Sequence, residues 1–211
     1  MSLDRTAARH RMVDDQLAAR GIADQRVLAA MRRVPRHEFV PDDLADLAYD
    51  DRPLPIGHDV TISQPYIVAL MSEVLGVQPT DRVLEIGTGS GYAAAVLAEL
   101  GAHVTTIECI APLARQASDR LARCGDRVIV IAGDGTLGHP DGAPYDAISV
   151  TAAGPAIPQP LLDQLAPEGR LVMPVGAGVE DLVRLTRTAD GDVTETIIQV
   201  RFVPLTGRHG A

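Results

Sequence analysis

The stretch RVLEIGTGSGYAAAVLAEL, residues 82–100, decides the fold. It begins with a short apolar run, passes through the glycine-rich segment GTGSG at 87–91, and continues with apolar residues at helical spacing. A strand that turns through glycines into a helix is the first half of a unit in which successive strands lie parallel. Sheets of this kind bind ligands at the carboxyl ends of their strands, so we expect a site at GTGSG.

The sequence after residue 100 repeats this alternation. The segments that read as strands or helices in turn are 103–108 (strand), 111–123 (helix), 127–135 (strand), 145–153 (strand), 158–166 (helix) and 169–176 (strand). Beyond them the helical pattern is lost, and Ala189-Asp190-Gly191-Asp192 predicts the turn of an antiparallel hairpin. The fold class is therefore α/β, with a doubly wound, mostly parallel, Rossmann-like sheet and a C-terminal antiparallel hairpin.

The residues before this core predict an N-terminal helical cap. Asp24 is a candidate N-cap, and the apolar residues 27, 28, 31 and 34 then share one helical face. DRPLPIG at 51–57 indicates an extended loop or turn. The length of 211 residues fits one domain (1–211), divided into a helical and loop cap (1–60), a cofactor-binding α/β core (61–176) and C-terminal strands (177–211).

Composition excludes several classes of protein. Hydrophobic residues make up 46% and charged residues 22%, as in ordinary globular proteins. The net charge of −9 argues against nucleic-acid binding, and the basic run at 32–37 is too short to change this. No apolar window is long enough to cross a membrane, and no N-terminal apolar segment predicts export. Cys109 and Cys124 form no CxxC pair, which predicts no metal site and reduced thiols in the cytoplasm.

Three acidic residues suggest which ligand the glycine turn takes. Glu108 ends the next predicted strand about 20 residues later, where a carboxylate accepts the hydroxyls of a ribose. Glu85 precedes the first glycine and suits a cationic ligand, and Asp134 in Gly-Asp-Gly (133–135) suits an adenine amino group. The glycine spacing also differs from the dinucleotide pattern G-x-G-x-x-G. An acidic ring around one pocket favours S-adenosyl-L-methionine over NAD.

Segments along nearly the whole chain resemble one known family. They are DDQLAARGIADQRVLAAMRRVPRHEFVP (14–41), LPIG (54–57), TISQPYIVA (61–69), VLEIGTGSGY (83–92), GDG (133–135), APYDAISVTAA (143–153) and RFVPLTG (201–207). The chain resembles the protein-L-isoaspartate (D-aspartate) O-methyltransferase family of the bacterial type, within the class I S-adenosylmethionine-dependent methyltransferases. TISQP together with VLEIGTGSGY makes the resemblance specific.

The resemblance implies methyl transfer from S-adenosyl-L-methionine to the α-carboxylate of L-isoaspartyl, and less well D-aspartyl, residues in damaged proteins. The products would be S-adenosyl-L-homocysteine and a methyl ester that cyclises to a succinimide. The implied partners are isoaspartyl-containing proteins and peptides. We expect a cytoplasmic monomer that binds neither nucleic acid nor a membrane. Two alternatives are a carboxyl methyltransferase for another peptide and a cofactor-binding relative that has lost catalysis; an NAD-dependent oxidoreductase is disfavoured by the glycine spacing.

The resemblance also implies roles for particular residues. Ser63 would contact the isoaspartyl carboxylate as the active-site residue. The implied substrate-binding residues are Ser63, Val150, Thr151, Val203 and Thr206. The implied cofactor-binding residues are Thr61, Ile62, Ser63, Glu85, Gly87, Gly89, Gly91, Glu108, Cys109, Asp134 and Gly135, and no metal is implied. Departures from the family pattern are Asp59 and Val60 before Thr-Ile-Ser, Cys109 after the ribose acid, and His139 after Gly-Asp-Gly.

A carboxylate methyl acceptor is consistent with an orienting role for Ser63. A carboxyl group with a pKa of about 4 is already ionised at neutral pH and needs no general base. Ser63 is therefore expected to orient the substrate, since an activated serine would need a base and His58 is the one local candidate. We also expect a helix to start at Gln64-Pro65-Tyr66 with Ser63 as its cap.

Overall fold

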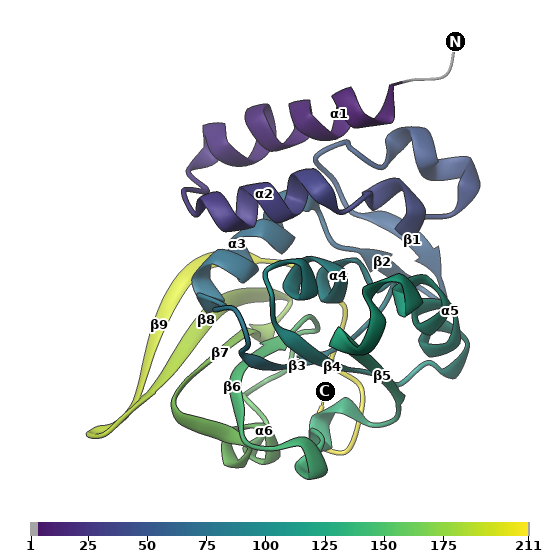
Figure 1. The fold of residues 1–211 in the computed structure, drawn as a ribbon. Helices are drawn as coiled ribbons and strands as arrows, with labels where there is room; N and C mark the ends of the chain where they lie inside the picture. The colour runs from purple at the N-terminus through teal and green to yellow at the C-terminus, as the bar shows by residue number, and fades with distance from the viewer. Residues whose placement is uncertain (1–3, 211) are drawn as a thin grey trace.

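The computed structural model describes residues 4–210, so the outermost residues of the predicted domain, 1–3 and 211, lie outside it. Seven strands form one sheet in the order β5-β4-β3-β6-β7-β8-β9 (Figure 1). They are β3 (Arg82–Ile86), β4 (His103–Glu108), β5 (Val128–Ala132), β6 (Tyr145–Val150), β7 (Leu165–Ala177), β8 (Val179–Thr188) and β9 (Gly191–Val200). The strands from β5 to β7 pair in parallel, and β8 and β9 pair antiparallel, which confirms the predicted fold class.

Helices cover both faces of the sheet, and the pleat of the strands explains why. On β3 the side chain of Val83 joins one hydrophobic cluster, while Leu84 and Ile86 join the other. The first cluster lies under α3 (Pro65–Leu75), α4 (Tyr92–Glu99) and α5 (Ala111–Leu121), and the second under the short α6 (Gln159–Asp163). The sheet is therefore doubly wound.

The N-terminal helical cap packs on the first of these layers. Helix α1 (Arg5–Arg11) continues through π-helical (Met12–Leu17) and 3-10 (Ala18–Arg20) turns to Gly21, and α2 (Gln25–Arg33) follows. Asp24 accepts a hydrogen bond from the backbone N–H of Arg26 at 2.8 Å, so the predicted N-cap is confirmed. Short 3-10 turns at Arg36–Phe39 and Asp42–Leu47 and two strands, β1 (Leu54–Gly57) and β2 (Val60–Ile62), complete the segment before α3.

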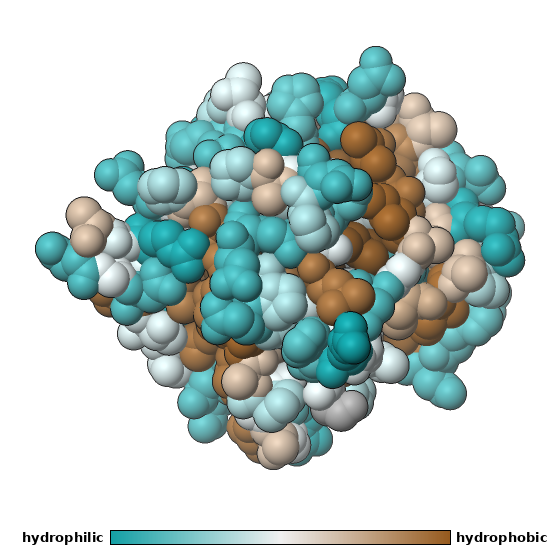
Figure 2. Space-filling view, turned by 90° about the horizontal axis from the view of Figure 1, so that it is seen from below, coloured by the Kyte–Doolittle hydropathy of each residue, from teal (hydrophilic) through white to brown (hydrophobic). Residues whose placement is uncertain are grey.

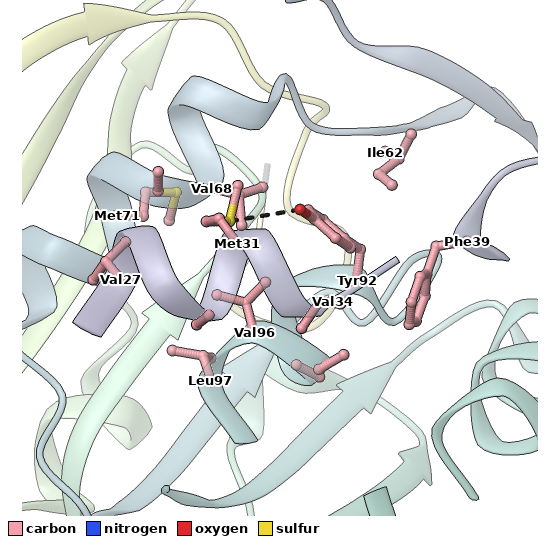
Figure 3. Packing of buried hydrophobic residues seen from close by; sticks show 14 of the residues in the cluster. Val27, Met31, Val34, Phe39, Ile62, Val68, Met71, Tyr92, Val96 and Leu97 are labelled. Atoms are coloured by element: carbon pink, nitrogen blue, oxygen red, sulfur yellow. Dashed lines mark hydrogen bonds between the residues drawn. The ribbon is translucent and has the colours of Figure 1, made fainter. Parts of the chain in front are cut away.

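The buried face of α2 reaches toward the centre of the molecule. Val27 and Met31 pack against α3 and α4, where they meet Val68 and Val96 (Figure 3). Met31 also accepts a hydrogen bond from the hydroxyl of Tyr92 at 3.5 Å, donor to sulfur. The cap is thereby in contact with the first residue of α4, directly after the glycine turn.

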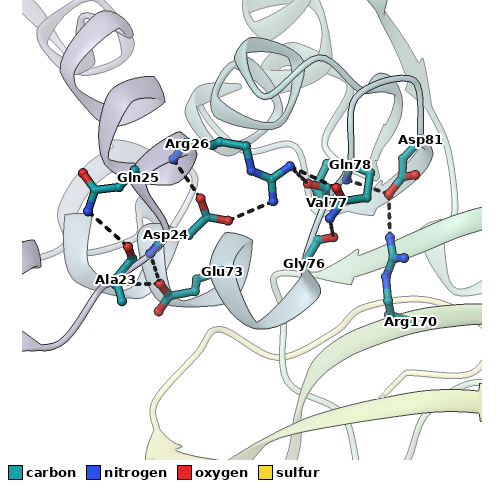
Figure 4. A network of polar contacts seen from close by, with 10 residues as sticks. All are labelled: Ala23, Asp24, Gln25, Arg26, Glu73, Gly76, Val77, Gln78, Asp81 and Arg170. Atoms are coloured by element: carbon teal, nitrogen blue, oxygen red, sulfur yellow. Dashed lines mark hydrogen bonds and ion pairs between the residues drawn. The ribbon is translucent and has the colours of Figure 1, made fainter.

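A polar network holds the other side of the cap (Figure 4). Glu73, near the end of α3, accepts the backbone N–H of Asp24 at 2.6 Å, and Asp24 pairs with Arg26 at 3.0 Å. Arg26 also donates to the carbonyl oxygen of residue 77 at 3.1 Å. Farther along the same loop, Asp81 pairs with Arg170 of β7 at 2.5 Å. The start of α2, the end of α3 and the sheet are connected in this way.

Hydrophilic and hydrophobic side chains both reach the surface. The face seen from below Figure 1 is a mosaic of hydrophilic residues with smaller hydrophobic patches (Figure 2). Among the large hydrophobic side chains, Ile129, Val179 and Val193 are exposed. Within residues 4–210 we find no helix with the length and apolar character that a membrane crossing requires.

Several predicted boundaries were wrong. The strand expected at 145–153 ends at Val150, because 151–153 leave the sheet and residue 153 pairs with Pro204 instead. The helix expected at 158–166 spans Gln159–Asp163, because β7 already begins at Leu165. The strand expected at 127–135 is Val128–Ala132: the N–H of Gly133 still donates to the carbonyl of Glu108, and a 3-10 turn follows at Gly135–Leu137.

Candidate functional site

A cavity of about 300 Å³ opens at the carboxyl ends of β3, β4 and β6. The order of the strands reverses beside β3, with β4 on one side and β6 on the other, and this is where sheets of this type bind ligands. The β1–β2 hairpin, the start of α3 and the segment 203–206 close the remaining sides. The glycine turn thus lies at the floor of a pocket, as predicted.

The glycine turn is held in place by both neighbouring strands. The N–H of Gly87 donates to the carbonyl of Ile107 at 2.9 Å, and the hydroxyl of Thr151 donates to the carbonyl of Gly87 at 2.7 Å. Gly87 has φ +92, and a Cβ there would lie 2.5 Å from Oγ1 of Thr151. A side chain at this position would therefore clash and strain the backbone, which explains the glycine.

Glu108 presents a fixed carboxylate to the cavity. Its Oε2 accepts the N–H of Gly89 at 2.7 Å and its Oε1 accepts the N–H of Ile110 at 3.0 Å. Only 5% of Glu108 is exposed, yet it lines the cavity. Its Oε1 also accepts the thiol of Cys109 at 3.6 Å, whereas Oε2 keeps a lone pair for a further donor. Burial, followed by the charge of Glu108, raises the pKa of the neighbouring Cys109 thiol, so Cys109 lines the cavity as a neutral group.

Glu85 is completely buried behind the turn. Its Oε2 accepts a hydrogen bond from the hydroxyl of Thr106 at 2.6 Å, and Thr106 is 2.6 Å from the hydroxyl of Thr88. Its other oxygen has no partner among residues 4–210. Burial raises the pKa of Glu85 to about 8, against the opposing hydrogen bond from Thr106. Glu85 is therefore a neutral acid at neutral pH, and it reaches the cavity only through Thr106 and Thr88.

Asp134 does not line the cavity either. Its carboxylate accepts the N–H and hydroxyl of Thr136 at 2.9 and 2.6 Å, and the N–H of Arg208 at 2.8 Å. Burial opposes its ionisation, but these hydrogen bonds outweigh burial and lower its pKa. Gly135 next to it does line the cavity. Of the three predicted acids, Glu108 alone lines the cavity.

The end of β2 and the start of α3 form the opposite wall. Thr61, Ile62 and Ser63 all line the cavity. Helix α3 begins at Pro65 with Gln64 at the N-cap, and no side chain caps it, so the predicted cap by Ser63 is wrong. Ser63 lies one residue too early to cap, and its hydroxyl makes no hydrogen bond within the described chain. It remains available to a ligand.

Most of the predicted site residues meet in this one cavity. Those that line it are Thr61, Ile62, Ser63, Gly87, Gly89, Glu108, Cys109, Gly135, Thr151, Val203 and Thr206. Glu85, Gly91, Asp134 and Val150 do not. Gly91 is the N-cap of α4 and packs against α5, and Val150 is fully buried in β6.

Other cavity residues were not predicted. Thr88, Ser90 and Tyr92 lie between or after the glycines, and the sequence signal for them was their place within the turn itself. His58 and Asp59 also line the cavity, although they are exposed. The sequence placed both next to Ser63, His58 as the local candidate base and Asp59 as a departure from the family pattern, and the pairing of β1 with β2 brings them to the cavity. Among residues 4–210 no group of three His, Cys, Asp or Glu residues is arranged to hold a metal ion.

Comparison with known proteins agrees with this geometry. The sequence model described as protein-L-isoaspartate(D-aspartate) O-methyltransferase matches residues 7–210. A protein-L-isoaspartate O-methyltransferase of Methanoregula boonei is 59% identical over 98% of this chain and 96% of its own length. Protein-L-isoaspartate O-methyltransferase 1 of Rhodopseudomonas palustris is 60% identical over 97% of this chain and 85% of its own.

Solved structures show the same likeness. One described as a protein-L-isoaspartate O-methyltransferase superposes with a TM-score of 0.86 at 29% identity, covering 96% of this chain and 67% of that one. A putative enzyme of the same name from Plasmodium falciparum, in complex with S-adenosyl-L-homocysteine, gives 0.82 at 25% identity, covering 94% and 98%. Sequence and structure agree over almost the whole length, and this chain belongs to the protein-L-isoaspartate(D-aspartate) O-methyltransferase family.

Proposed function

We propose that this chain transfers a methyl group from S-adenosyl-L-methionine to the α-carboxylate of L-isoaspartyl, and less well D-aspartyl, residues in damaged proteins and peptides. The observation that carries the proposal is a single cavity with the buried Glu108 carboxylate on one wall and the unengaged Ser63 hydroxyl on the other. Membership of the family supports the same reaction.

The cavity suits the cofactor. Its volume of about 300 Å³ is at the small end of ligand sites, and its lining is largely apolar with a few polar groups. Glu108 would accept the two ribose hydroxyls, Gly135 would lie along the adenine, and Gly87 and Gly89 would let backbone approach the methionine portion. Thr61, Ile62 and Cys109 would complete the walls, with Glu85, Gly91 and Asp134 supporting them from behind.

When bound, S-adenosyl-L-methionine supplies a methyl group on a positively charged sulfur. The substrate carboxylate would accept that methyl group, with the carbon–sulfur bonding electrons left on sulfur, so Ser63 and the start of α3 would have to hold the carboxylate in line with it. The protein contributes placement and exclusion of water. Ser63 would donate a hydrogen bond to the carboxylate, and the start of α3 favours an anion there.

No proton has to be removed from the acceptor, so His58 need not act as a base. Thr151, Val203 and Thr206 would hold the substrate, with Val150 behind them. The methyl ester would then cyclise to a succinimide, whose hydrolysis restores part of the normal aspartyl linkage. We further propose that the segments 1–60, 61–176 and 177–211 act as one domain and one monomer, in a reducing cytoplasm where Cys109 and Cys124 stay free.

The test is incubation with methyl-labelled cofactor and two peptides that differ only in an isoaspartyl or a normal aspartyl linkage. The proposal predicts label on the isoaspartyl peptide alone, and its release by mild base as expected of an ester. Equal labelling of both peptides, or label stable to base, would overturn it. Binding of the cofactor without any transfer would instead indicate a relative without catalysis.

A further inference from the structure

The turn of the β1–β2 hairpin has an unusual backbone. Gly57 pairs with Val60, so His58 and Asp59 form a two-residue turn. Both have positive φ, +54 and +58. Such turns favour Asn-Gly or Asp-Gly, because a side chain in the left-handed region is sterically unfavourable. Asp and His adopt this region more readily than most residues with a side chain, so the turn is compatible with His58 and Asp59.

The same two residues lie at the mouth of the cavity. His58 and Asp59 are both exposed and both line it. Asp59 makes no hydrogen bond and no ion pair with any other residue in the range 4–210. The other acid on the cavity wall, Glu108, is buried and already accepts two backbone N–H groups. Asp59 is therefore an uncompensated negative charge beside the entrance.

A charge in this place acts on whatever peptide enters. The expected substrate carries its own carboxylate into the cavity that His58 and Asp59 help to line, so a residue flanking the isoaspartyl residue would lie near the hairpin turn. We propose that Asp59 is a specificity residue that selects isoaspartyl sites flanked by cationic residues and disfavours those flanked by acidic ones. This inference rests on the proposed function and adds a preference for sequence context to it.

The experiment uses three isoaspartyl peptides that are identical except that Lys, Gln or Glu stands on both sides of the isoaspartyl residue. The ratio of kcat/KM for the Lys peptide to that for the Glu peptide is measured for the wild type and for Asp59→Asn. Asn tolerates positive φ, so this change removes the charge and keeps the turn. The matched control is Asp190→Asn, the same loss of charge in the exposed turn between β8 and β9.

We expect the Lys-to-Glu ratio to fall about 2- to 5-fold in Asp59→Asn, the size expected for one exposed charge, and to stay at the wild-type value in Asp190→Asn. The change should reside in KM, since Asp59 touches no reacting atom. Added salt should lower the wild-type ratio toward that of Asp59→Asn.

An unchanged ratio in Asp59→Asn, with all three peptides still methylated, would overturn the role of Asp59 and leave the proposed function intact. A similar fall in Asp190→Asn would also overturn it, because the effect would then come from net charge. Failure of the wild type to methylate any of the three peptides would overturn the proposed function itself, and this inference with it.

Discussion

At the scale of single residues, the direction of a side chain matters as much as its type. Glu85 and Glu108 both lie at or near strand ends, yet only Glu108 lines the cavity. Glu85 stands directly opposite Thr106 in the pairing of β3 with β4, so the pleat turns it into the interior. Glu108 is the last residue of β4, and the backbone beyond it brings its carboxylate under Gly89. Sequence spacing identified the acids but not which way they face.

The first prediction concerns Glu108. Glu108→Gln should weaken binding of S-adenosyl-L-methionine by roughly ten- to a hundred-fold, because hydrogen bonds to a charged acceptor contribute about 1.5–3 kcal/mol. Titration calorimetry measures the dissociation constant. Asp163→Asn, on the exposed surface of α6, serves as the control and should bind like the wild type. A dissociation constant unchanged in Glu108→Gln would contradict the ribose assignment.

The second prediction concerns Glu85 and pH. In the folded chain the pKa of Glu85 is about 8, so its carboxyl group stays protonated at neutral pH. In the unfolded chain the pKa of Glu85 has its ordinary, lower value, so the group is ionised at neutral pH. Between those values the folded state binds more protons, so the contribution of Glu85 to stability falls as pH rises. Glu85→Gln resembles the protonated acid and should lack this loss. Denaturant unfolding at pH 5 and pH 8 measures it, and an identical pH dependence in both proteins would show that Glu85 is ionised when folded.

At the scale of secondary-structure elements, local pattern predicted the parts that local interactions determine. The prediction of a strand, a glycine turn and a helix within 82–100 is confirmed. The spacing of the apolar residues and the positions of the glycines indicate the same boundaries there. The β1–β2 hairpin was not predicted, since β1 contains Pro55 and β2 has three residues, and only their mutual pairing makes them strands. The hairpin that brings His58 and Asp59 to the cavity wall therefore could not be predicted from either strand alone.

The start of α3 gives the third prediction. Ser63→Ala should lower the rate of methyl transfer and leave affinity for the cofactor and the melting temperature unchanged, because Ser63 neither caps α3 nor bonds to another residue of the described chain. Kinetics with an isoaspartyl peptide and calorimetry with the cofactor separate the two effects. Parallel losses of both would mean that Ser63 shapes the cofactor site instead of orienting the substrate.

The start of α2 gives the fourth prediction. Asp24→Ala removes the N-cap of α2 and its pair with Arg26, and should destabilise the protein by about 0.5–2 kcal/mol. Asp24→Asn retains a capping oxygen and should lose less. Urea unfolding followed by circular dichroism measures both. Equal stability of the alanine variant and the wild type would show that the network in Figure 4 does not hold the cap.

At the scale of the whole molecule, the cap and the sheet meet at the cavity. Met31 of α2 contacts Tyr92, which lines the cavity and follows the glycine turn. At the opposite side, residues 203–206 return from β9 to close the pocket, and residue 153 pairs with Pro204. Segments from the beginning, middle and end of the chain thus build one site, which accounts for a likeness to the family that extends over residues 7–210.

The central claim is that this site recognises the isoaspartyl linkage, and a competition measures it most directly. The wild type is given the cofactor and an equal mixture of two peptides of identical sequence, one with an isoaspartyl and one with a normal aspartyl linkage, and the products are followed by chromatography and mass spectrometry. We predict a methyl ester and then a succinimide from the isoaspartyl peptide, with the normal peptide left unmodified by the enzyme. Methylation of both peptides at similar rates, or of neither, would contradict the account.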